Sequence, residues 1–387
     1  MLVNVDPKRW ALLAAVERIR AEVEQASVDG ESLMSLPAST VGAIADARLF
    51  AMKLPEAVGG AEADLLTQYE VVEAMAYADA SAGWCLMIGA SSIAIPGAFL
   101  PDSAAEEVFA GGTIPLAATS TAPTGTATEA DDGYVLNGRW SFASGVRHSE
   151  WLNVGALVRD KGSEVPRRLL FALPTRKAHI LDNWDTIGLR STGSCDLILD
   201  DVFVPTSFVC DIASGEPARG GPLYRLGLPA FVAYEHAAFA IGVARRAIDT
   251  IVELAPTKRR GSPPINLADR SSFQRDLGLL NLRLRAARAL VLERNREAWD
   301  VVSAGQKPDA RLQTELRSSA TLATDVALEV VTQAYRYAGG GAVYKPNVLE
   351  RSVRDLYTAT QHFMVSDSAY EAHGKVLLGL SDVSPMS

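Results

Sequence analysis

The stretch GYVLNGRWSFASGVRHSEW, residues 133–151, decides how the centre of this sequence folds. It follows an Asp-Asp-Gly turn and carries β-branched and aromatic residues, which predicts a strand from Tyr134 to Trp140. Short runs of the same kind, divided by Gly, Pro and Asp, continue over about 113–215. This pattern is typical of a small antiparallel sheet or barrel.

Helical spacing of apolar residues flanks this central region on both sides. It runs from residue 7 to about 110 and returns in four long segments, roughly 226–255, 268–303, 308–338 and 346–378. Four helices of this length with short connections predict an antiparallel bundle. The sequence therefore predicts a mainly α protein with a central β domain, in three domains: N-terminal helical domain 1–112, β-barrel domain 113–215 and C-terminal four-helix bundle 216–387.

Length, charge and cysteine content limit the class of protein. A chain of 387 residues is too long for one ordinary domain. Lys and Arg number 37 against 46 Asp and Glu, and there is no long basic run, so nucleic acid is not an expected partner. The three cysteines lack CxxC spacing, which argues against structural zinc and fits a reducing cytoplasm.

One segment is long enough to be weighed as a membrane span. Residues 80–101 carry no charge. Three glycine residues, a proline and several serines dilute its hydrophobicity, however, and the first ten residues lack a signal-peptide pattern. We therefore expect a buried core helix in a soluble, cytoplasmic protein with no membrane partner.

Several common catalytic signatures are absent from the sequence. It contains neither GxGxxG after a strand nor GxxxxGK[ST], so a Rossmann site and a P-loop are not supported. HExxH and GxSxG are also missing. The five histidines show no metal-ligand spacing, and we expect no metal site.

Three local groups of residues could carry chemistry. Residues 140–151 combine aromatic rings and hydroxyls at a strand end, which would suit a planar heteroaromatic cofactor or, alternatively, a β-corner packed by tryptophans. Gly339–Gly341 lie at a helix junction, where backbone amides can approach a phosphate or simply cap the helix. Residues 354, 358 and 362 share a helical face by i, i+4 spacing, so His362 would be a catalytic base or a structural histidine.

Ordered motifs along the chain resemble those of one enzyme family. They are TSTAPTG (119–125), NGRW (137–140), Ser144-Gly145, His148, Trp151, DTIGLRSTGS (185–194) and DVFVP (201–205). Gly339-Gly340 precede Arg354-Asp355 by the family's fifteen-residue interval. The sequence resembles the acyl-CoA dehydrogenase superfamily, most closely its two-component flavin-dependent monooxygenase branch, related to dibenzothiophene monooxygenase and 3-hydroxy-9,10-secosteroid hydroxylase.

This resemblance implies a flavin cofactor, FAD or FMN, and a homotetramer. The residues that it assigns to flavin binding are Thr119, Thr121, Trp140, Ser141, Phe142, Ser144, Gly339, Gly340 and Arg260. Trp140, Ser141, Phe142 and Ser144 would line the isoalloxazine ring. Gly339 and Gly340 would approach the nucleotide end, with Arg260 supplied by a neighbouring subunit.

The resemblance leaves two enzymatic branches open, and the catalytic base distinguishes them. Most dehydrogenases of the family carry a glutamate shortly after the Arg-Asp pair, where this chain reads QHFM, residues 361–364. Glu235 lies seven residues before Gly242, as in the isovaleryl-CoA type, so a dehydrogenase with Glu235 as base and an electron-transfer flavoprotein as partner is the first alternative. A flavin-binding protein without catalytic activity is the second.

The monooxygenase branch implies a separate NAD(P)H:flavin reductase that supplies reduced flavin. Oxygen would then form a C4a-hydroperoxide, with Ser144 bonded to flavin N5 and His362 accepting the proton of a phenol. Several relatives have a second histidine after a Gly-Trp pair, whereas Gly83-Trp84 is followed by none. We therefore expect oxygenation of a small aromatic or heteroatom-containing substrate. Since His236 lies about 100° from Glu235 around a helix, at most one of the two would face the pocket.

Overall fold

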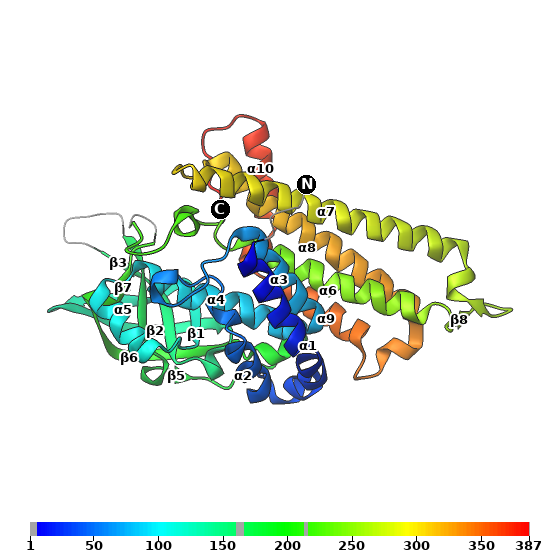
Figure 1. Ribbon diagram of the computed structural model, residues 1–387, viewed down its shortest axis with the longest axis horizontal. Coiled ribbons are helices and arrows are strands. Elements are labelled where there is room, and N and C mark those ends of the chain that lie inside the picture. Colours follow the sequence, from blue (N-terminus) through cyan, green and yellow to red (C-terminus); the bar gives the residue numbers. More distant parts are fainter. Residues whose placement is uncertain (1–5, 160–165, 213–215, 387) are drawn as a thin grey trace. The chain divides into compact units, whose positions relative to one another are not determined.

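The computed structural model describes residues 6–159, 166–212 and 216–386, and the chain forms two compact units. The first unit consists of Met1–Asp64, Trp84–Asp185 and Arg190–Gly227, and the second of Leu65–Gly83, Thr186–Leu189 and Leu228–Ser387. Elements follow the predicted order of helices, strands and helices (Figure 1). The predicted domain ends at residues 1, 215 and 387 lie outside the described residues.

The helices of the first unit contain buried apolar residues. They are α1 (Pro7–Leu33), α2 (Ala38–Asp46), α5 (Asp102–Val108) and, from Trp84 on, α4 (Ala80–Phe99). The Asp6 carboxylate accepts a hydrogen bond from the Lys8 N–H (2.9 Å) and so caps the start of α1. Within the described residues α4 alone is apolar and long enough to cross a bilayer, and 83% of its most apolar window is buried. That burial agrees with the predicted core helix.

A seven-stranded sheet forms the rest of the first unit. Its strands are β1 (Ala117–Ala130), β2 (Gly133–Ala143), β3 (Trp151–Val158), β4 (Arg167–Pro174), β5 (His179–Ile180), β6 (Cys195–Pro205) and β7 (Val209–Cys210). They are hydrogen-bonded in the order β5-β6-β2-β1-β3-β4-β7. Strands β1 and β3 run parallel, because the chain crosses from β2 to the far edge of β1. The sheet is therefore mixed, which corrects the prediction of a purely antiparallel one, and this order begins and ends at β5 and β7 instead of closing.

Trp140 fills the space between the central strands. Its side chain is 0% exposed, and its indole N–H donates to the Gly155 carbonyl oxygen (2.7 Å). Gly125 faces the ring so closely that a Cβ there would overlap it. The motif residues Gly125 and Trp140 thus form one packing unit inside the sheet.

The second unit is helical. Its helices are α3 (Leu65–Ala78), α6 (Ala233–Leu254), α7 (Ser271–Ser303), α8 (Ala310–Ala338), α9 (Val348–Ala359) and α10 (Ser368–Leu377). Helix α8 packs against α6, α7, α9 and α10, and α3 packs against α6. A Cβ at Gly242 would overlap the Glu73 carbonyl oxygen, so glycine permits the close approach of α3 and α6. The inclusion of α3 in this unit was not predicted from the sequence.

The fourth segment of the predicted bundle is not one helix. Helix α9 ends at Ala359 and α10 begins at Ser368, with the short 3-10 helix η11 (Phe363–Val365) between them. His362 lies in this break and not on a helical face, which corrects the predicted i, i+4 alignment of residues 354, 358 and 362.

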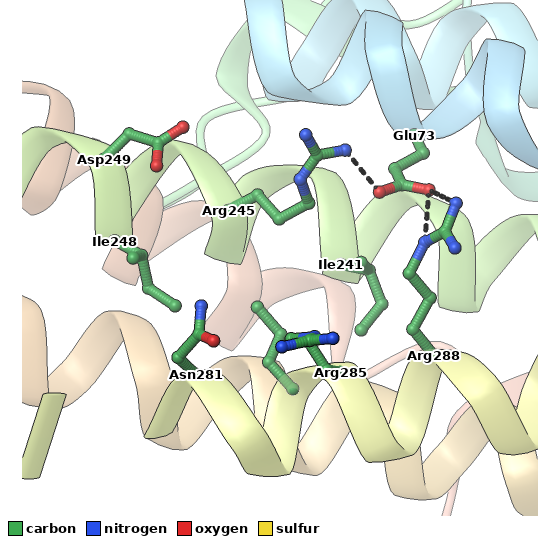
Figure 2. Close-up of a pocket in the computed structure, with 9 residues that line it drawn as sticks. Glu73, Ile241, Arg245, Ile248, Asp249, Asn281, Arg285 and Arg288 are labelled. Atoms are coloured by element: carbon green, nitrogen blue, oxygen red, sulfur yellow. Dashed lines mark hydrogen bonds and ion pairs between the residues drawn. The ribbon is translucent and has the colours of Figure 1, made fainter. Parts of the chain in front are cut away.

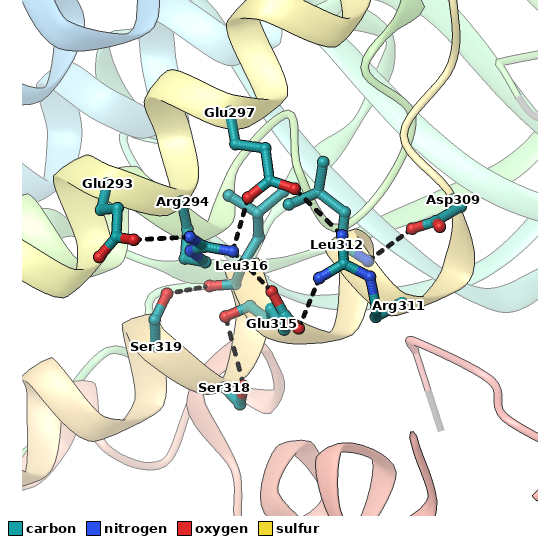
Figure 3. Close-up of polar contacts among 10 residues, drawn as sticks. All are labelled: Glu293, Arg294, Glu297, Asp309, Arg311, Leu312, Glu315, Leu316, Ser318 and Ser319. Atoms are coloured by element: carbon teal, nitrogen blue, oxygen red, sulfur yellow. Dashed lines mark hydrogen bonds and ion pairs between the residues drawn. The ribbon is translucent and has the colours of Figure 1, made fainter. Parts of the chain in front are cut away.

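The connection between α7 and α8 is held by charged side chains (Figure 3). Arg294 contacts Glu293, Glu297 and Glu315, while Arg311 contacts Glu297 and Glu315. The Asp309 carboxylate accepts from the Leu312 N–H (2.8 Å) and caps the N-terminus of α8. These contacts fix the register of the two longest helices of the second unit.

Replacement of this cap tests its contribution. We expect Asp309→Ala to lower the free energy of unfolding by about 1 kcal/mol, because the first turn of α8 loses its acceptor. Urea denaturation at fixed protein concentration measures the difference. The matched control is Asp300→Ala on the exposed side of α7; an equal loss in both variants would contradict the capping role.

Candidate active site

A chain of hydroxyl groups lies in the first unit where β2 ends. The Trp84 indole N–H donates to Ser144 Oγ (3.0 Å), and Ser144 Oγ lies 2.8 Å from Ser194 Oγ. Ser194 Oγ is in turn 2.6 Å from Thr192 Oγ1. A hydroxyl has one proton to donate and two positions to accept. Trp84 occupies one acceptor position of Ser144, so Ser144 can serve one further partner as donor or acceptor, depending on the direction of the Ser194 contact.

Neither Trp84 nor Ser194 was predicted to take part in a site. Both nevertheless lie inside sequence motifs: Trp84 in the Gly-Trp pair and Ser194 at the end of the 185–194 motif. Their residue types indicated that each would need a hydrogen-bond partner, since a buried indole N–H or serine hydroxyl is normally paired. The partners themselves depend on residues that are distant in sequence.

The structure separates the aromatic residues of the 140–151 stretch. Trp140 has no exposed face left for a ligand, which corrects the expectation that it lines the isoalloxazine ring. Phe142 is 72% exposed at a positive φ of 63°, and its ring is nearly perpendicular to that of Trp184, with the ring centroids 6.3 Å apart. Of the aromatic residues in this stretch, Phe142 is the most exposed, and Trp151 is partly exposed and stacks on Phe208.

The remaining predicted residues of the first unit lie along the same strands. The Thr119 hydroxyl accepts from the Asn153 amide (3.0 Å), and the Thr121 carbonyl oxygen accepts from Arg168 (2.6 Å). Ser141 is partly exposed, and its carbonyl oxygen accepts from Ser120 (2.9 Å). These contacts order the β1–β2 edge that leads to Ser144.

His148 packs beneath the same corner. Burial lowers its pKa to about 4, so the ring is neutral at pH 7. A Cβ on Gly145 would lie 2.8 Å from His148 Nε2, and Gly145 has a φ of 75°. This close packing indicates that His148 steadies the corner.

In the second unit, His362 caps η11 with its own side chain. Its Nδ1 accepts a hydrogen bond from the Met364 N–H (3.3 Å). The ring keeps some accessible surface, yet surrounding protein lowers its pKa to about 4. A neutral imidazole whose Nδ1 accepts a hydrogen bond carries its proton on Nε2.

The guanidinium of Arg317 holds the backbone on which His362 lies. Arg317 is 2% exposed and donates to the carbonyl oxygens of Phe363 (2.8 Å), Met364 (3.3 Å) and Pro385 (3.1 Å). It also donates to the hydroxyls of Ser366 (3.1 Å) and Ser368 (2.9 Å). The Phe363 carbonyl oxygen also accepts from the Ser366 N–H (3.4 Å) and hydroxyl (3.0 Å), and Arg317 supplies further donors where the helix is broken. No sequence motif marked this residue.

The ring of His236 lies against that of His362. Their centroids are 4.4 Å apart and their planes differ by 31°. Glu235 and His236 are both buried in the first turn of α6, but the ring contact to His362 is made by His236. The centroid of the Phe363 ring lies 4.7 Å from that of the His362 ring. The structure thus brings together two histidines that sequence spacing had left apart.

Two other predicted residues, Arg260 and Gly339, lie side by side in the second unit. Arg260 is in the short hairpin of β8 (Arg259–Arg260) and β9 (Ile265–Asn266) before α7. A Cβ on Gly339 would overlap the Arg260 guanidinium, and one on Gly341 would lie 3.5 Å from Lys258 Nζ. Gly339 and Arg260 therefore belong to one basic cradle of the same chain.

The Arg-Asp pair anchors residues 186–189 to the second unit. The Asp355 carboxylate accepts from the Leu189 N–H (2.7 Å), and Arg354 donates to the Ile187 carbonyl oxygen (2.8 Å). A Cβ on Gly188 would overlap the Arg354 carbonyl oxygen. Burial raises the pKa of Asp355 to about 7. The Arg354-Asp355 pair and the 185–194 motif are therefore explained by packing against each other.

A cavity of about 420 Å³ lies among α3, α6 and α7 of the second unit (Figure 2). It is lined by Glu73, Ile241, Arg245, Ile248, Asp249, Asn281, Leu284, Arg285 and Arg288. Glu73 is 2% exposed and pairs with Arg245 (2.6 Å) and Arg288 (2.9 Å). The lining includes none of the residues predicted from the sequence, and the paired charges account for its polarity.

Comparison with known proteins gives consistent matches along the chain. The family "Acyl-CoA dehydrogenase, N-terminal domain" matches residues 11–99 and "Acyl-CoA dehydrogenase, C-terminal domain" matches residues 234–367. Indole-3-acetate monooxygenase of Pseudomonas putida is 31% identical over 326 residues, which is 84% of this chain and 83% of that protein. The flavin-dependent monooxygenase oxygenase subunit HsaA of Rhodococcus jostii is 27% identical, over 90% of this chain and 94% of its own.

A solved structure shows the same architecture. XiaF from Streptomyces sp., in complex with FADH2 and glycerol, superimposes with a TM-score of 0.88. It is 26% identical and covers 98% of this chain and 98% of its own.

Removal of the Arg317 guanidinium tests the role assigned to it. We expect Arg317→Met to lower the free energy of unfolding by about 3 kcal/mol, because several buried oxygens lose a charged donor. Urea denaturation at constant protein concentration measures this, and Arg336→Met, an exposed arginine on the same helix, is the control. Equal stability of both variants would contradict the role.

Proposed function

The chain belongs to the acyl-CoA dehydrogenase superfamily, in its flavin-dependent monooxygenase branch, and we propose that it is the oxygenase component of a two-component flavin-dependent monooxygenase. A separate NAD(P)H:flavin reductase would supply the reduced flavin, and dioxygen would be the co-substrate. Indole-3-acetate in the name of one relative supports a small aromatic substrate. FADH2 in the XiaF complex supports FAD over FMN.

The hydroxyl chain at Ser144 fits a flavin in either redox state. Reduced flavin presents N5 as an N–H donor, whereas oxidised flavin presents it as an acceptor. Because Ser144 can donate to Ser194 or accept from it, its remaining position can match either form. Trp84 keeps the Ser144 oxygen in place in both cases. This adaptability supports Ser144 as the partner of N5.

The basic cradle at Gly339 fits the phosphate end of FAD. Arg260 beside Gly339 and Lys258 beside Gly341 supply positive charge, and nothing lies within 4 Å of the position of a Cβ on Gly340. If a neighbouring subunit supplied Arg260 to a flavin, as the family resemblance implies, it would supply Gly339 as well. A homotetramer in which each flavin contacts two chains rests on the family resemblance and stays a proposal.

The observation that carries the proposed function is the identity of the side chain in the break between α9 and α10. An imidazole is present there, neutral at pH 7 and held by η11 and His236, where a dehydrogenase would need a carboxylate. Bound reduced flavin would supply the electrons that activate dioxygen. His362 would position the substrate oxygen or heteroatom by a hydrogen bond, and Phe142 would cover the ring from water.

The dehydrogenase alternative rests on Glu235. Its carboxyl is buried in the first turn of α6. If Glu235 were a base, acyl-CoA substrates would bleach the oxidised flavin, and Glu235→Gln would abolish the bleaching. The named activities of the relatives favour the monooxygenase. A cytoplasmic location also stays a proposal, supported by the burial of α4.

Rapid mixing of the reduced FAD complex with oxygen tests the proposal. We expect a transient absorbance distinct from those of reduced and oxidised flavin, because the protein excludes water and holds N5. Ser144→Ala should shorten its lifetime at least tenfold, whereas Ser149→Ala, a hydroxyl of the same corner that donates to Val146, should not. Direct reoxidation of the wild-type complex without a transient would refute the monooxygenase.

Substitution of the cradle glycine tests cofactor binding separately. Gly339→Ala should weaken reduced-FAD binding at least tenfold, since Gly339 has a φ of 68° and its Cβ would displace Arg260. Anaerobic titration measures the dissociation constant. Gly278→Ala, where nothing lies within 4 Å, is the control. Unchanged affinity in Gly339→Ala would rule out the cradle as a flavin site.

A further inference from the structure

The direction of the hydrogen bond at His362 is fixed by the protein itself. Its Nδ1 accepts from the Met364 N–H, so the lone pair of Nδ1 is engaged and the proton of the neutral ring lies on Nε2. The other ring nitrogen therefore offers an N–H group. A residue in this state can donate a hydrogen bond from Nε2, but it cannot accept a proton there.

Three contacts keep the ring from turning over to the opposite tautomer. Arg317 fixes the carbonyl oxygens of Phe363 and Met364, and so also fixes the direction of the Met364 N–H. His236 covers one side of the ring at 4.4 Å. A linear N–H···N bond between ring edges would place the centroids farther apart, since both ring radii add to the donor–acceptor distance. The contact is therefore packing of ring on ring.

We propose that His362 acts as a hydrogen-bond donor through Nε2, and that His236 is the positioning residue that holds its ring in this orientation. The proposal rests on the proposed function, in which His362 faces the substrate. It reverses the role expected from the sequence, where His362 accepted a proton from a phenol. The site would instead select an acceptor, such as a phenolate oxygen, and the phenol would lose its proton to water before it binds.

The two helices packed against η11, α6 and α8, contribute charged and titratable groups, of which an ionised Glu235 would oppose a bound anion. Helix α6 contributes Glu235 and His236, and α8 contributes Arg317, whose donors are directed to carbonyl and hydroxyl oxygens. Burial is the cause that lowers the pKa of His362, so the ring stays neutral. Because the ring is neutral, a bound anion would be stabilised by the hydrogen bond that Nε2 donates and not by an opposite charge.

The ionisation state of a bound phenol tests the proposal without flavin or turnover. The probe is 4-nitrophenol, whose phenolate has a visible absorbance band that the neutral phenol lacks. The purified full-length protein is titrated with the probe over a range of pH. We expect the bound probe to ionise at lower pH than the free probe, with about a tenfold preference for the anion.

Four variants separate the two roles. His362→Gln keeps an N–H donor and should retain the preference, whereas His362→Leu should lose it. His236→Phe keeps ring packing and should behave as wild type, whereas His236→Ala should reduce the preference severalfold. Circular dichroism confirms that each variant is folded, and His236→Phe serves as the packed counterpart of His236→Ala.

Several outcomes would overturn the proposal. They are a bound probe that stays neutral in the wild type, an unchanged preference in His362→Leu or His236→Ala, and an absence of saturable binding. Since the assay contains no flavin, its failure leaves the oxygen reaction untouched. A failed oxygen reaction with intact phenolate binding would in turn refute only the monooxygenase.

Discussion

The second unit depends on one buried guanidinium. Arg317 donates to carbonyl and hydroxyl oxygens at the point where the last long helical segment breaks. Without the guanidinium, the Phe363 carbonyl oxygen would keep only its contacts to Ser366, and the hydrogen bonds from Arg317 to Met364 and Pro385 would be lost. The bend is what removes His362 from a helix and lets its side chain cap η11. The contacts that supply hydrogen bonds to this backbone therefore also set the orientation of the His362 ring.

Each unit contributes a polar group whose state is set by neighbours in the same unit. In the first, Trp84 and Ser194 define what the Ser144 hydroxyl can still donate or accept. In the second, Met364 and His236 define which nitrogen of His362 carries the proton. Both the Ser144 hydroxyl and the His362 imidazole are uncharged at neutral pH. Each would act through the direction in which it donates or accepts a hydrogen bond. Such preorganised dipoles suit chemistry in which water must be excluded, because they add no buried charge.

The sequence predicted the order of helices and strands, because the spacing of apolar residues can be read from each segment alone. It also identified the family motifs, several of which proved to be packing devices, such as Gly125 against Trp140 and Gly188 against Arg354. It could not show the parallel β1–β3 pair, the break after Ala359 or the burial of Trp140, since each depends on distant partners. The apolar residues keep helical spacing through 346–378, although the helix itself ends at Ala359 and a new one begins at Ser368. The pairing of His236 with His362 likewise required the fold.

The most direct test of the central claim is a crystal structure of the protein with reduced FAD bound under anaerobic conditions. The account predicts an isoalloxazine ring with N5 within hydrogen-bond distance of Ser144 Oγ, and a His362 side chain whose Nδ1 still accepts from the Met364 N–H. A flavin bound away from Ser144, or a His362 side chain turned into solvent with Nδ1 released from Met364, would contradict it.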